Sequence, residues 1–337
     1  MRERPATDLP LISLVAPVYN EEAIVRVFVT EVMGALEAIQ PPVAYEIVLV
    51  NDGSSDRSGE LLDGLAAEFP GGLKVIHLSR NFGHGPAIFA GLDQSRGDAV
   101  ILMDSDLQDD PAAFAAFIEK WRQGYDAVYA MRTARNESLP IRLAMAAFYR
   151  LLGMISSTPI QRDSGTFSLM TRRLVDLLKS MPEQNCFLPG LRSWIGFRQT
   201  SVPVPRRSRH DQNSRVGIFG LVKLSMNAIF SFSYFPIFVF QIVGIAALLC
   251  GFGLALFVLY HKFLTHRSVA TWASEMLSIL FFGGINLFGL GIIGEYIARI
   301  YDELKARPRY VIDHITQSVP VPDKGKDLAQ SGGEGKK

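Results

Sequence analysis

The chain contains few cysteines and shows almost no charge imbalance. Its 337 residues include two cysteines, Cys186 and Cys250, which lie far apart, so the sequence has no disulfide framework and no sign of an oxidising compartment. The formal net charge is only +1, and no global field points to nucleic acid or to an acidic partner. The length suggests two units, or one domain with appended parts.

Two phosphate-binding loops are also absent. The sequence has no G-x-x-x-x-G-K-[ST] motif, and the glycines of NFGHGPA, residues 81–87, lack the third glycine of a dinucleotide fingerprint. A protein that binds a nucleotide without either loop must hold the phosphates in another way.

Charged residues are missing from two long stretches. No Asp, Glu, Lys or Arg occurs in residues 224–260 or in 277–294. A helix needs about 20 mainly apolar residues to cross a bilayer. The sequence therefore predicts two transmembrane helices, at about 236–260 and 276–298, joined by residues 261–275 into a hairpin. Two buried core helices are the alternative.

Basic residues around these stretches predict their orientation. Both flanks of the hairpin are basic, whereas its connecting loop holds only Lys262 and Arg267. Because Lys and Arg accumulate on the cytoplasmic side, we expect both termini and residues 1–210 on that side of the inner membrane. The flanking basic residues are Arg206, Arg207, Arg209, Arg215, Lys223, Arg299, Lys305, Arg307 and Arg309.

The segment before the first span has its own pattern. Residues 211–235 carry apolar side chains at roughly helical spacing, which predicts an amphipathic helix at the membrane interface. The start of a long transmembrane helix is the alternative. The chain would then consist of a cytosolic domain at 1–210, this interfacial helix, the hairpin at 236–300 and a cytosolic tail at 301–337. The end of that tail, 313–337, is expected to be disordered.

The first 130 residues alternate strand and helix patterns. Helical patterns at 21–38, 58–69 and 112–121 separate short β-rich runs, at 11–18, 46–50, 73–78, 99–103 and 126–130. This alternation predicts an α/β domain with a mostly parallel sheet covered on both faces. Such sheets bind ligands outside the carboxyl ends of their strands. The segments that follow the runs are PVYNEE, NDGSSD, SRNFGHG, DSDLQ and MRTARN.

DSDLQDDP, residues 104–111, gathers four aspartates directly after a β-rich run. Asp109 and Asp110, followed by Pro111, are explained as the start of a helix. Asp104 and Asp106 have no such explanation. Two carboxylates at a strand end suit Mg²⁺ or Mn²⁺, which take oxygen ligands and leave positions for substrate phosphates. Such a cation offsets the charge of a departing diphosphate.

Five motifs in this order closely resemble the family 2 glycosyltransferases of GT-A fold. They are PVYNEE (17–22), NDGSSD (51–56), RNFGHGPAIFAGLD (80–93), DSDLQDDP (104–111) and DSGTFSLMTRR (163–173). Together with the membrane hairpin, they resemble in particular the polyprenyl-phosphate glycosyltransferases, over residues 10 to about 310. The resemblance implies a Rossmann-like GT-A domain, a nucleotide-sugar donor (a UDP-hexose or GDP-mannose), a divalent cation and a lipid acceptor in the membrane.

The resemblance also implies roles for individual residues. The expected nucleotide-binding residues are Pro17, Tyr19, Glu21, Asp52 and Asp104, and the expected metal ligands are Asp104, Asp106 and Gln108. The expected catalytic residues are Asp163, Asp106 and Arg132. Of these, Asp163 occupies the family's acid or base position, and Arg132 the position near the acceptor phosphate. Asn51 is a departure, because many relatives have a second aspartate there.

Simpler explanations are open for three of these residues. Asp52 lies in NDGS, which is a strong turn signal by itself, and the two roles can coexist. Arg132 is otherwise a solvated loop base. Asp163 is otherwise the cap of a helix at 166–178.

The chemistry of the acceptor bears on these roles. A phosphate monoester has a second pKa of about 6, so it is mostly a dianion at neutral pH and needs little help from a general base. Its charge must be screened, for which Arg132, Arg206, Arg209 and Arg215 are available. We therefore expect an inverting transfer of a hexose to a polyprenyl phosphate, such as undecaprenyl phosphate, in the making of a cell-envelope glycan. The resemblance favours UDP-glucose as donor.

Two other functions remain as alternatives. A processive polysaccharide synthase would carry a Gln-X-X-Arg-Trp motif and more spans, whereas this chain has only LRSW at 191–194. A membrane-tethered nucleotide-sugar binding protein would bind without turnover. Glycines within 281–296 permit close helix packing, which fits a homo-oligomer and ordinary transmembrane glycine usage equally.

Overall fold

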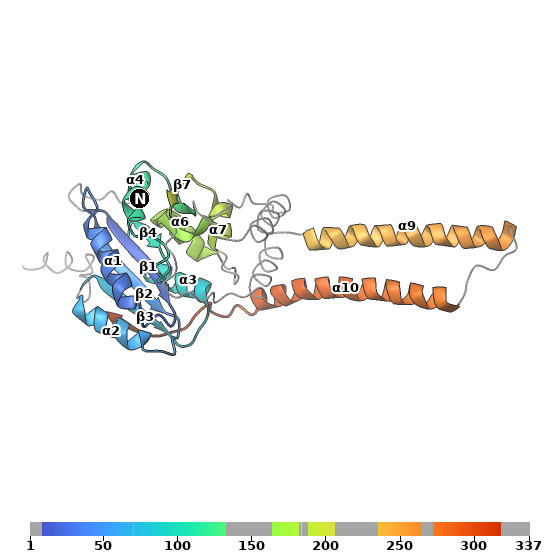
Figure 1. Cartoon of the computed structure of the whole chain (residues 1–337), viewed down its shortest axis with the longest axis horizontal. Coiled ribbons are helices and arrows are strands. Elements are labelled where there is room, and N and C mark those ends of the chain that lie inside the picture. The colour runs from blue at the N-terminus through green and yellow to red at the C-terminus, as the bar shows by residue number, and fades with distance from the viewer. Residues whose placement is uncertain are drawn as a thin grey trace, which may run out of the picture. The chain divides into compact units, whose positions relative to one another are not determined.

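The computed structural model describes residues 9–69, 71–132, 164–181, 183, 188–205, 235–264 and 272–317 (Figure 1). The chain divides into two compact units. One is an α/β unit, to which the chain returns from Pro308 onward, and the other contains two long helices. The predicted interfacial helix at 211–235 lies outside the described residues except for its last residue.

The α/β unit is built on one eight-stranded sheet. Its order is β7-β5-β6-β4-β1-β2-β3-β8. The strands are β1 Leu11–Val18, β2 Ala44–Asn51, β3 Leu73–Leu78, β4 Ala99–Leu102, β5 Ala127–Arg132, β6 Ser164–Thr171, β7 Gln199–Val204 and β8 Ile312–Gln317. The five predicted β-rich runs are the first five strands, and two of them, β1 and β3, have the predicted bounds.

Helices cover both faces of this sheet, as the alternating pattern predicts. One face packs on α1 Val25–Glu37, α2 Ser58–Glu68 and α4 Ala113–Arg122. The other packs on α3 His84–Gln94, α6 Arg172–Ser180 and α7 Leu188–Ile195. Because both faces are covered, the central strands are buried along nearly their whole length and are mainly apolar rather than alternating.

The sheet is mixed, with four parallel and three antiparallel pairings among the strands that the structure describes. β1, β2, β3 and β4 form parallel pairs, and β5 pairs with β7 in parallel. However, β6 runs antiparallel to both β4 and β5, and β8 runs antiparallel to β3. β6 also overturns the helix considered at 166–178, because the chain is extended to Thr171 and α6 begins only at Arg172. Asp163 therefore precedes a strand.

The C-terminal segment differs from the tail that the sequence predicts. Residues 312–317 form β8, whose register places His314 opposite His77 of β3. Just before it, the Tyr310 hydroxyl donates to Asp93 of α3, and the Arg309 guanidinium lies over the Phe89 ring. Residues 313–317 are thus an ordered part of the α/β unit, because a bare β3 edge pairs readily with another strand.

The second unit contains α9 Phe235–Leu264 and α10 Trp272–Leu304, which run side by side in opposite directions (Figure 1). Among the described residues, one helical stretch, Ser278–Leu304, is long and apolar enough to cross a bilayer, and the apolar part of α9, Ile237–Gly253, is shorter. The two-span hairpin therefore stays a prediction. A Cβ at Gly289 would overlap the Phe240 ring, so this glycine lets the helices approach closely.

Candidate active site

The carboxyl ends of three neighbouring strands meet at one edge of the sheet. β1 pairs in parallel with both β2 and β4. The Asp52 backbone N–H donates to the Val18 carbonyl oxygen at 2.9 Å, and the Ser105 hydroxyl donates to the Pro17 carbonyl oxygen at 2.8 Å. These bonds hold PVYNEE, NDGSSD and DSDLQDDP together, as expected for segments that follow parallel strands.

PVYNEE and NDGSSD are further joined by side chains that bond backbone groups. The Asn20 N–H donates to the Ser54 hydroxyl at 3.0 Å, and the Glu21 N–H donates at 2.9 Å to the hydroxyl of Ser58, the first residue of α2. In return, the Ser55 N–H donates to Asn20 Oδ1 at 2.8 Å. The two motifs therefore form one rigid wall of the edge.

Asp52 links this wall to the loop before α3. Its two carboxylate oxygens accept the backbone N–H groups of Phe82 and Gly83, at 2.8 and 3.0 Å. Burial raises the pKa of Asp52, while the two N–H donors and His84 oppose that rise. Asp52 thus holds a neighbouring loop in addition to its place in the NDGS turn.

Asp104 lies between α3 and β6. Its Oδ1 is 2.7 Å from His84 Nε2, and its Oδ2 accepts the Thr166 hydroxyl at 3.3 Å. Burial disfavours the charged imidazole, but the hydrogen bond to Asp104 and the charges of Asp104, Asp52 and Asp106 outweigh it and raise the pKa of His84. All five sequence motifs therefore contribute side chains to one acidic edge, which also carries a histidine.

Asp106 and Gln108 lie in a tight turn after Asp104. The Gln108 N–H donates to Asp106 Oδ1 at 3.2 Å, and Leu107 between them has a φ of 57°. Gln108 is buried, while Asp104 and Asp106 are partly exposed. Two carboxylates that solvent can reach and one amide are the oxygen donors that Mg²⁺ and Mn²⁺ prefer, so these residues fit the expected cation.

The structure describes only some of the remaining predicted residues. Pro17 and Glu21 are half-buried in the wall, and Tyr19 is exposed. Arg132 is the last residue of β5, so its backbone lies at the same edge as the start of β6, but its side chain is outside the description. Asp163, Arg206, Arg209 and Arg215 lie outside the described residues.

His84 and Thr166 were not predicted as site residues. Both lie in motifs that the resemblance had singled out, RNFGHGPAIFAGLD and DSGTFSLMTRR. A usable signal existed for His84, because it is the histidine of a polar segment that follows a β-rich run. Thr166 gave no such signal, because its contact with Asp104 depends on the antiparallel strand β6.

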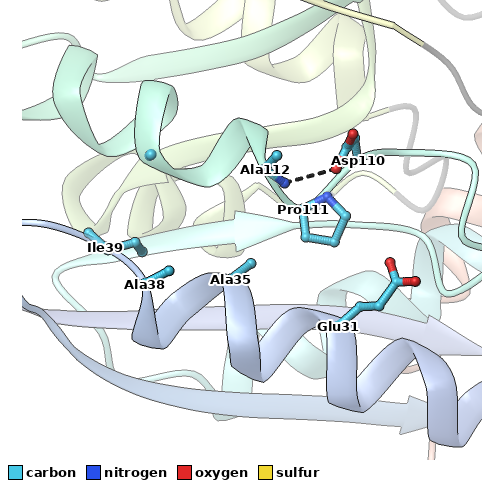
Figure 2. A pocket seen from close by; sticks show the side chains of 8 residues that line it. Glu31, Ala35, Ala38, Ile39, Asp110, Pro111 and Ala112 are labelled. Carbon is cyan, nitrogen blue, oxygen red and sulfur yellow. Dashed lines mark hydrogen bonds between the residues drawn. The ribbon is translucent and has the colours of Figure 1, made fainter.

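Asp110 has the structural role that the sequence predicts. Its Oδ1 accepts the Ala112 N–H at 3.0 Å at the start of α4. A groove of about 410 Å³ lies between this helix start and α1, lined among others by Glu31, Ala35 and Pro111 (Figure 2). Neither Asp104 nor Asp106 lines this groove, so it is separate from the acidic edge.

LRSW, the weak match to the synthase motif, lies on α7. Arg192 is buried with its guanidinium over the Tyr129 ring, and burial lowers the pKa of Arg192 to about 10. Its Nε and Nη1 have no hydrogen-bond partner within the part of the chain that the structure describes. Trp194 is exposed. The arginine and the tryptophan therefore face different surroundings.

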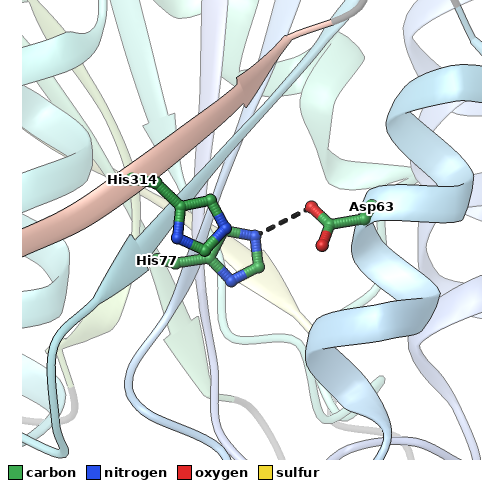
Figure 3. A group of neighbouring side chains, drawn as sticks. All are labelled: Asp63, His77 and His314. Carbon is green, nitrogen blue, oxygen red and sulfur yellow. Dashed lines mark hydrogen bonds and ion pairs between the residues drawn. The ribbon is translucent and has the colours of Figure 1, made fainter.

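A second group with metal-ligand chemistry is formed by residues other than Asp104 and Asp106. Asp63, His77 and His314 come from α2, β3 and β8, and one ligand atom of each lies within 4.8 Å of the others (Figure 3). The hydrogen bonds of His77 decide whether this group can take an ion.

The fold defines the class: an α/β protein with polar motifs at the carboxyl ends of its parallel strands, where sheets of this kind bind ligands. A family model described as glycosyl transferase family 2 matches residues 13–178. The chain belongs to this family, which confirms the resemblance of its motifs.

Curated relatives extend over most of the chain. An uncharacterized glycosyltransferase of Bacillus subtilis, YkcC, is 42% identical over 89% of this chain and 92% of its own. The bactoprenol glucosyl transferase of Shigella phage SfX is 40% identical over 89% and 98%. The undecaprenyl-phosphate 4-deoxy-4-formamido-L-arabinose transferase of Pseudomonas aeruginosa is 34% identical over 93% and 92%.

Proposed function

We propose that the protein transfers a hexose, with UDP-glucose as the favoured donor, to a polyprenyl phosphate with inversion at the anomeric carbon. The observation that carries this proposal is the convergence of Asp52, His84 and Asp104 at one strand edge. The relatives support the acceptor class, because two of them are named for bactoprenol and undecaprenyl-phosphate transfer and match nearly end to end.

The edge offers distinct groups for each part of the donor. Pro17, Tyr19, Glu21, Asp52 and Asp104 would line the nucleotide pocket, and Asp104, Asp106 and Gln108 would hold Mg²⁺ or Mn²⁺. When bound, such a cation offsets negative charge on the leaving diphosphate. This arrangement replaces the phosphate-binding loops that the sequence lacks.

The reaction needs screening of charge more than proton removal. An oxygen of the acceptor phosphate bonds to the anomeric carbon, the bond from that carbon to the diphosphate breaks, and the nucleoside diphosphate leaves with the bonding electrons. Because the acceptor is already mostly a dianion at pH 7, we assign Arg132, Arg206, Arg209 and Arg215 to its phosphate. Asp163 then helps to orient groups rather than serving as an obligatory base.

The second unit would keep the site at the membrane. α10 offers a span, and many apolar side chains of α9 and α10 are exposed, such as Leu248 and Leu287. Exposed apolar surface of this extent is expected where lipid covers it. We propose a two-span hairpin in the inner membrane, an interfacial helix at 211–235, and both termini in the cytoplasm.

We expect purified membranes containing the protein to transfer sugar from one nucleotide sugar of a panel to undecaprenyl phosphate, giving one sugar per lipid. Mass spectrometry of the lipid product identifies the sugar, and EDTA should abolish transfer until Mg²⁺ or Mn²⁺ is restored. A lipid or polymer carrying many sugars would instead indicate a processive synthase. Nucleotide-sugar binding without product would indicate a binding protein.

A further inference from the structure

His77 is a buried histidine with partners on every side. Its Nδ1 is 3.0 Å from Asn51 Nδ2, and its Nε2 is 3.0 Å from Asp63 Oδ1. Its ring stacks on that of His314, with centroids 4.2 Å apart and planes 6° from parallel (Figure 3). Strands β2, β3 and β8 and helix α2 therefore meet at this side chain.

The hydrogen bonds determine where the proton of His77 lies. Asn51 Oδ1 accepts the Ser54 N–H at 3.0 Å, so the amide nitrogen of Asn51 must be the atom that faces His77. An amide nitrogen only donates. His77 Nδ1 therefore accepts this bond, and the ring proton resides on Nε2, where it is donated to Asp63.

This proton arrangement argues against a metal ion at the group. A histidine ligand needs a free lone pair on one ring nitrogen and normally donates its other N–H to an acceptor. In His77 the Nδ1 lone pair is engaged by Asn51, and Nε2 carries the proton. Moreover, two parallel stacked rings cannot both aim an in-plane lone pair at one ion. The group is a chain of protein contacts.

This series of contacts reaches the edge where the nucleotide is proposed to bind. His314 of β8 packs on His77, His77 orients Asn51, and Asn51 holds the N–H of Ser54. The Ser54 hydroxyl in turn accepts the N–H of Asn20 in PVYNEE. The Asn51 side chain is also packed closely against α2, because a Cβ at Gly59 would lie 3.1 Å from Asn51 Nδ2.

We propose that His77 is a positioning residue for the nucleotide-binding turn NDGSSD, and that the C-terminal strand β8 holds His77 in place. The inference rests on the proposed function for the assignment of a nucleotide to this turn. It explains the departure at Asn51: an aspartate there could accept from Ser54 but could not donate to Nδ1 of a neutral His77. It also gives the segment after α10 a part in donor binding.

The test compares substitutions that distinguish the contribution of the His77 ring from that of its hydrogen-bond acceptor. His77→Phe keeps a stacking ring but removes the acceptor, whereas His77→Asn places an acceptor oxygen near the position of Nδ1 and removes the ring. Using the full-length protein in detergent with Mg²⁺, the dissociation constants of UDP and GDP are measured by calorimetry. For the nucleotide that binds, we expect His77→Phe to weaken binding by about tenfold, the effect of one good hydrogen bond.

Two further comparisons make the test specific. We expect His77→Asn to bind the nucleotide within about twofold of wild type even though both variants lower the melting temperature, because the acceptor rather than the ring acts on the turn. His314→Ala should weaken nucleotide binding and His314→Phe should restore it. Ile315→Ala, on the other face of β8, is the control for general loosening of the strand.

The outcomes separate the hypotheses. Equal nucleotide affinity in wild type and His77→Phe would overturn the inference while leaving the proposed function intact. Wild-type protein that binds neither nucleotide would contradict the proposed function and the inference with it. Saturable Zn²⁺ binding that is lost in both His77→Phe and His314→Phe would also overturn the inference, because the group would then be a metal site.

Acidification gives an independent check. The titratable groups that face His77 are Asp63 on α2 and His314 and Asp313 on β8. Burial lowers the pKa of His77 below the ordinary value of about 6.5, although the carboxylates of Asp63 and Asp313 oppose this shift. The unfolded chain therefore takes up a proton before the folded protein does, and stability falls as pH drops below about 6.5. We expect His77→Asn to show a smaller fall in melting temperature between pH 7 and pH 5, and an identical fall would contradict the assigned proton position.

Discussion

Asp106→Asn is expected to reduce the transfer of sugar to lipid by about a hundredfold to a thousandfold, the usual effect of removing one preorganised electrostatic group from an active site. The substitution keeps the size of the side chain and an oxygen that can accept the Gln108 N–H. It removes the negative charge that, together with Asp104, would attract the divalent cation. The fold should therefore persist while donor-dependent turnover is lost, as measured by labelled sugar transferred per minute.

Asp110→Asn is the matched control for this loss. It makes the same chemical change four residues later, where the side chain accepts the Ala112 N–H at the start of α4. Asparagine serves this capping role about as well as aspartate. We expect Asp110→Asn to retain nearly full activity and Asp106→Asn to retain a normal melting temperature.

Asp163→Asn separates two mechanisms. Because a phosphate acceptor is already mostly deprotonated at pH 7, we expect this variant to lose much less activity than Asp106→Asn. Equal losses in the two variants would show that an obligatory base acts at Asp163.

The sequence predicted the strands at the centre of the sheet and the edge where their ends meet. The strands β1 and β3 are short, mainly apolar runs followed by polar motifs, and buried parallel strands have this signature. The rule that ligands bind beyond the carboxyl ends then placed Asp52 and Asp104 together, and the structure connects both to the start of α3.

Long-range pairing is what the sequence could not supply. SGTFSLMT is compatible with either a helix or a strand by local pattern, and only its antiparallel pairing with β4 and β5 makes it β6. Likewise, residues 312–317 are polar enough to read as a tail, and they become β8 because β3 offers an unpaired edge. The contacts of Thr166 and His314 follow from these two pairings and were invisible beforehand.

Gly53→Ala is expected to destabilise the α/β unit by about 3–5 kcal/mol, the sum of a left-handed backbone strain and a clash in packed structure. Gly53 has a φ of +62°, and a Cβ there would overlap the carbonyl carbon of Arg80 and lie 2.5 Å from the backbone nitrogen of Asn81. Those backbone atoms cannot move aside alone. They immediately precede Phe82 and Gly83, whose N–H groups bond the Asp52 carboxylate.

Gly71→Ala is the matched control, because the difference between the two substitutions gives the part of the destabilisation that comes from the clash. Gly71 also has a positive φ, of +90°, but a Cβ at this position would meet no atom within 4 Å, so only backbone strain of about 1 kcal/mol is expected there. By thermal unfolding, Gly53→Ala should lower the melting temperature several times more than Gly71→Ala, and only Gly53→Ala should also weaken nucleotide binding. Equal effects of the two substitutions would mean that the contact between NDGSSD and the loop before α3 does not hold the candidate site together.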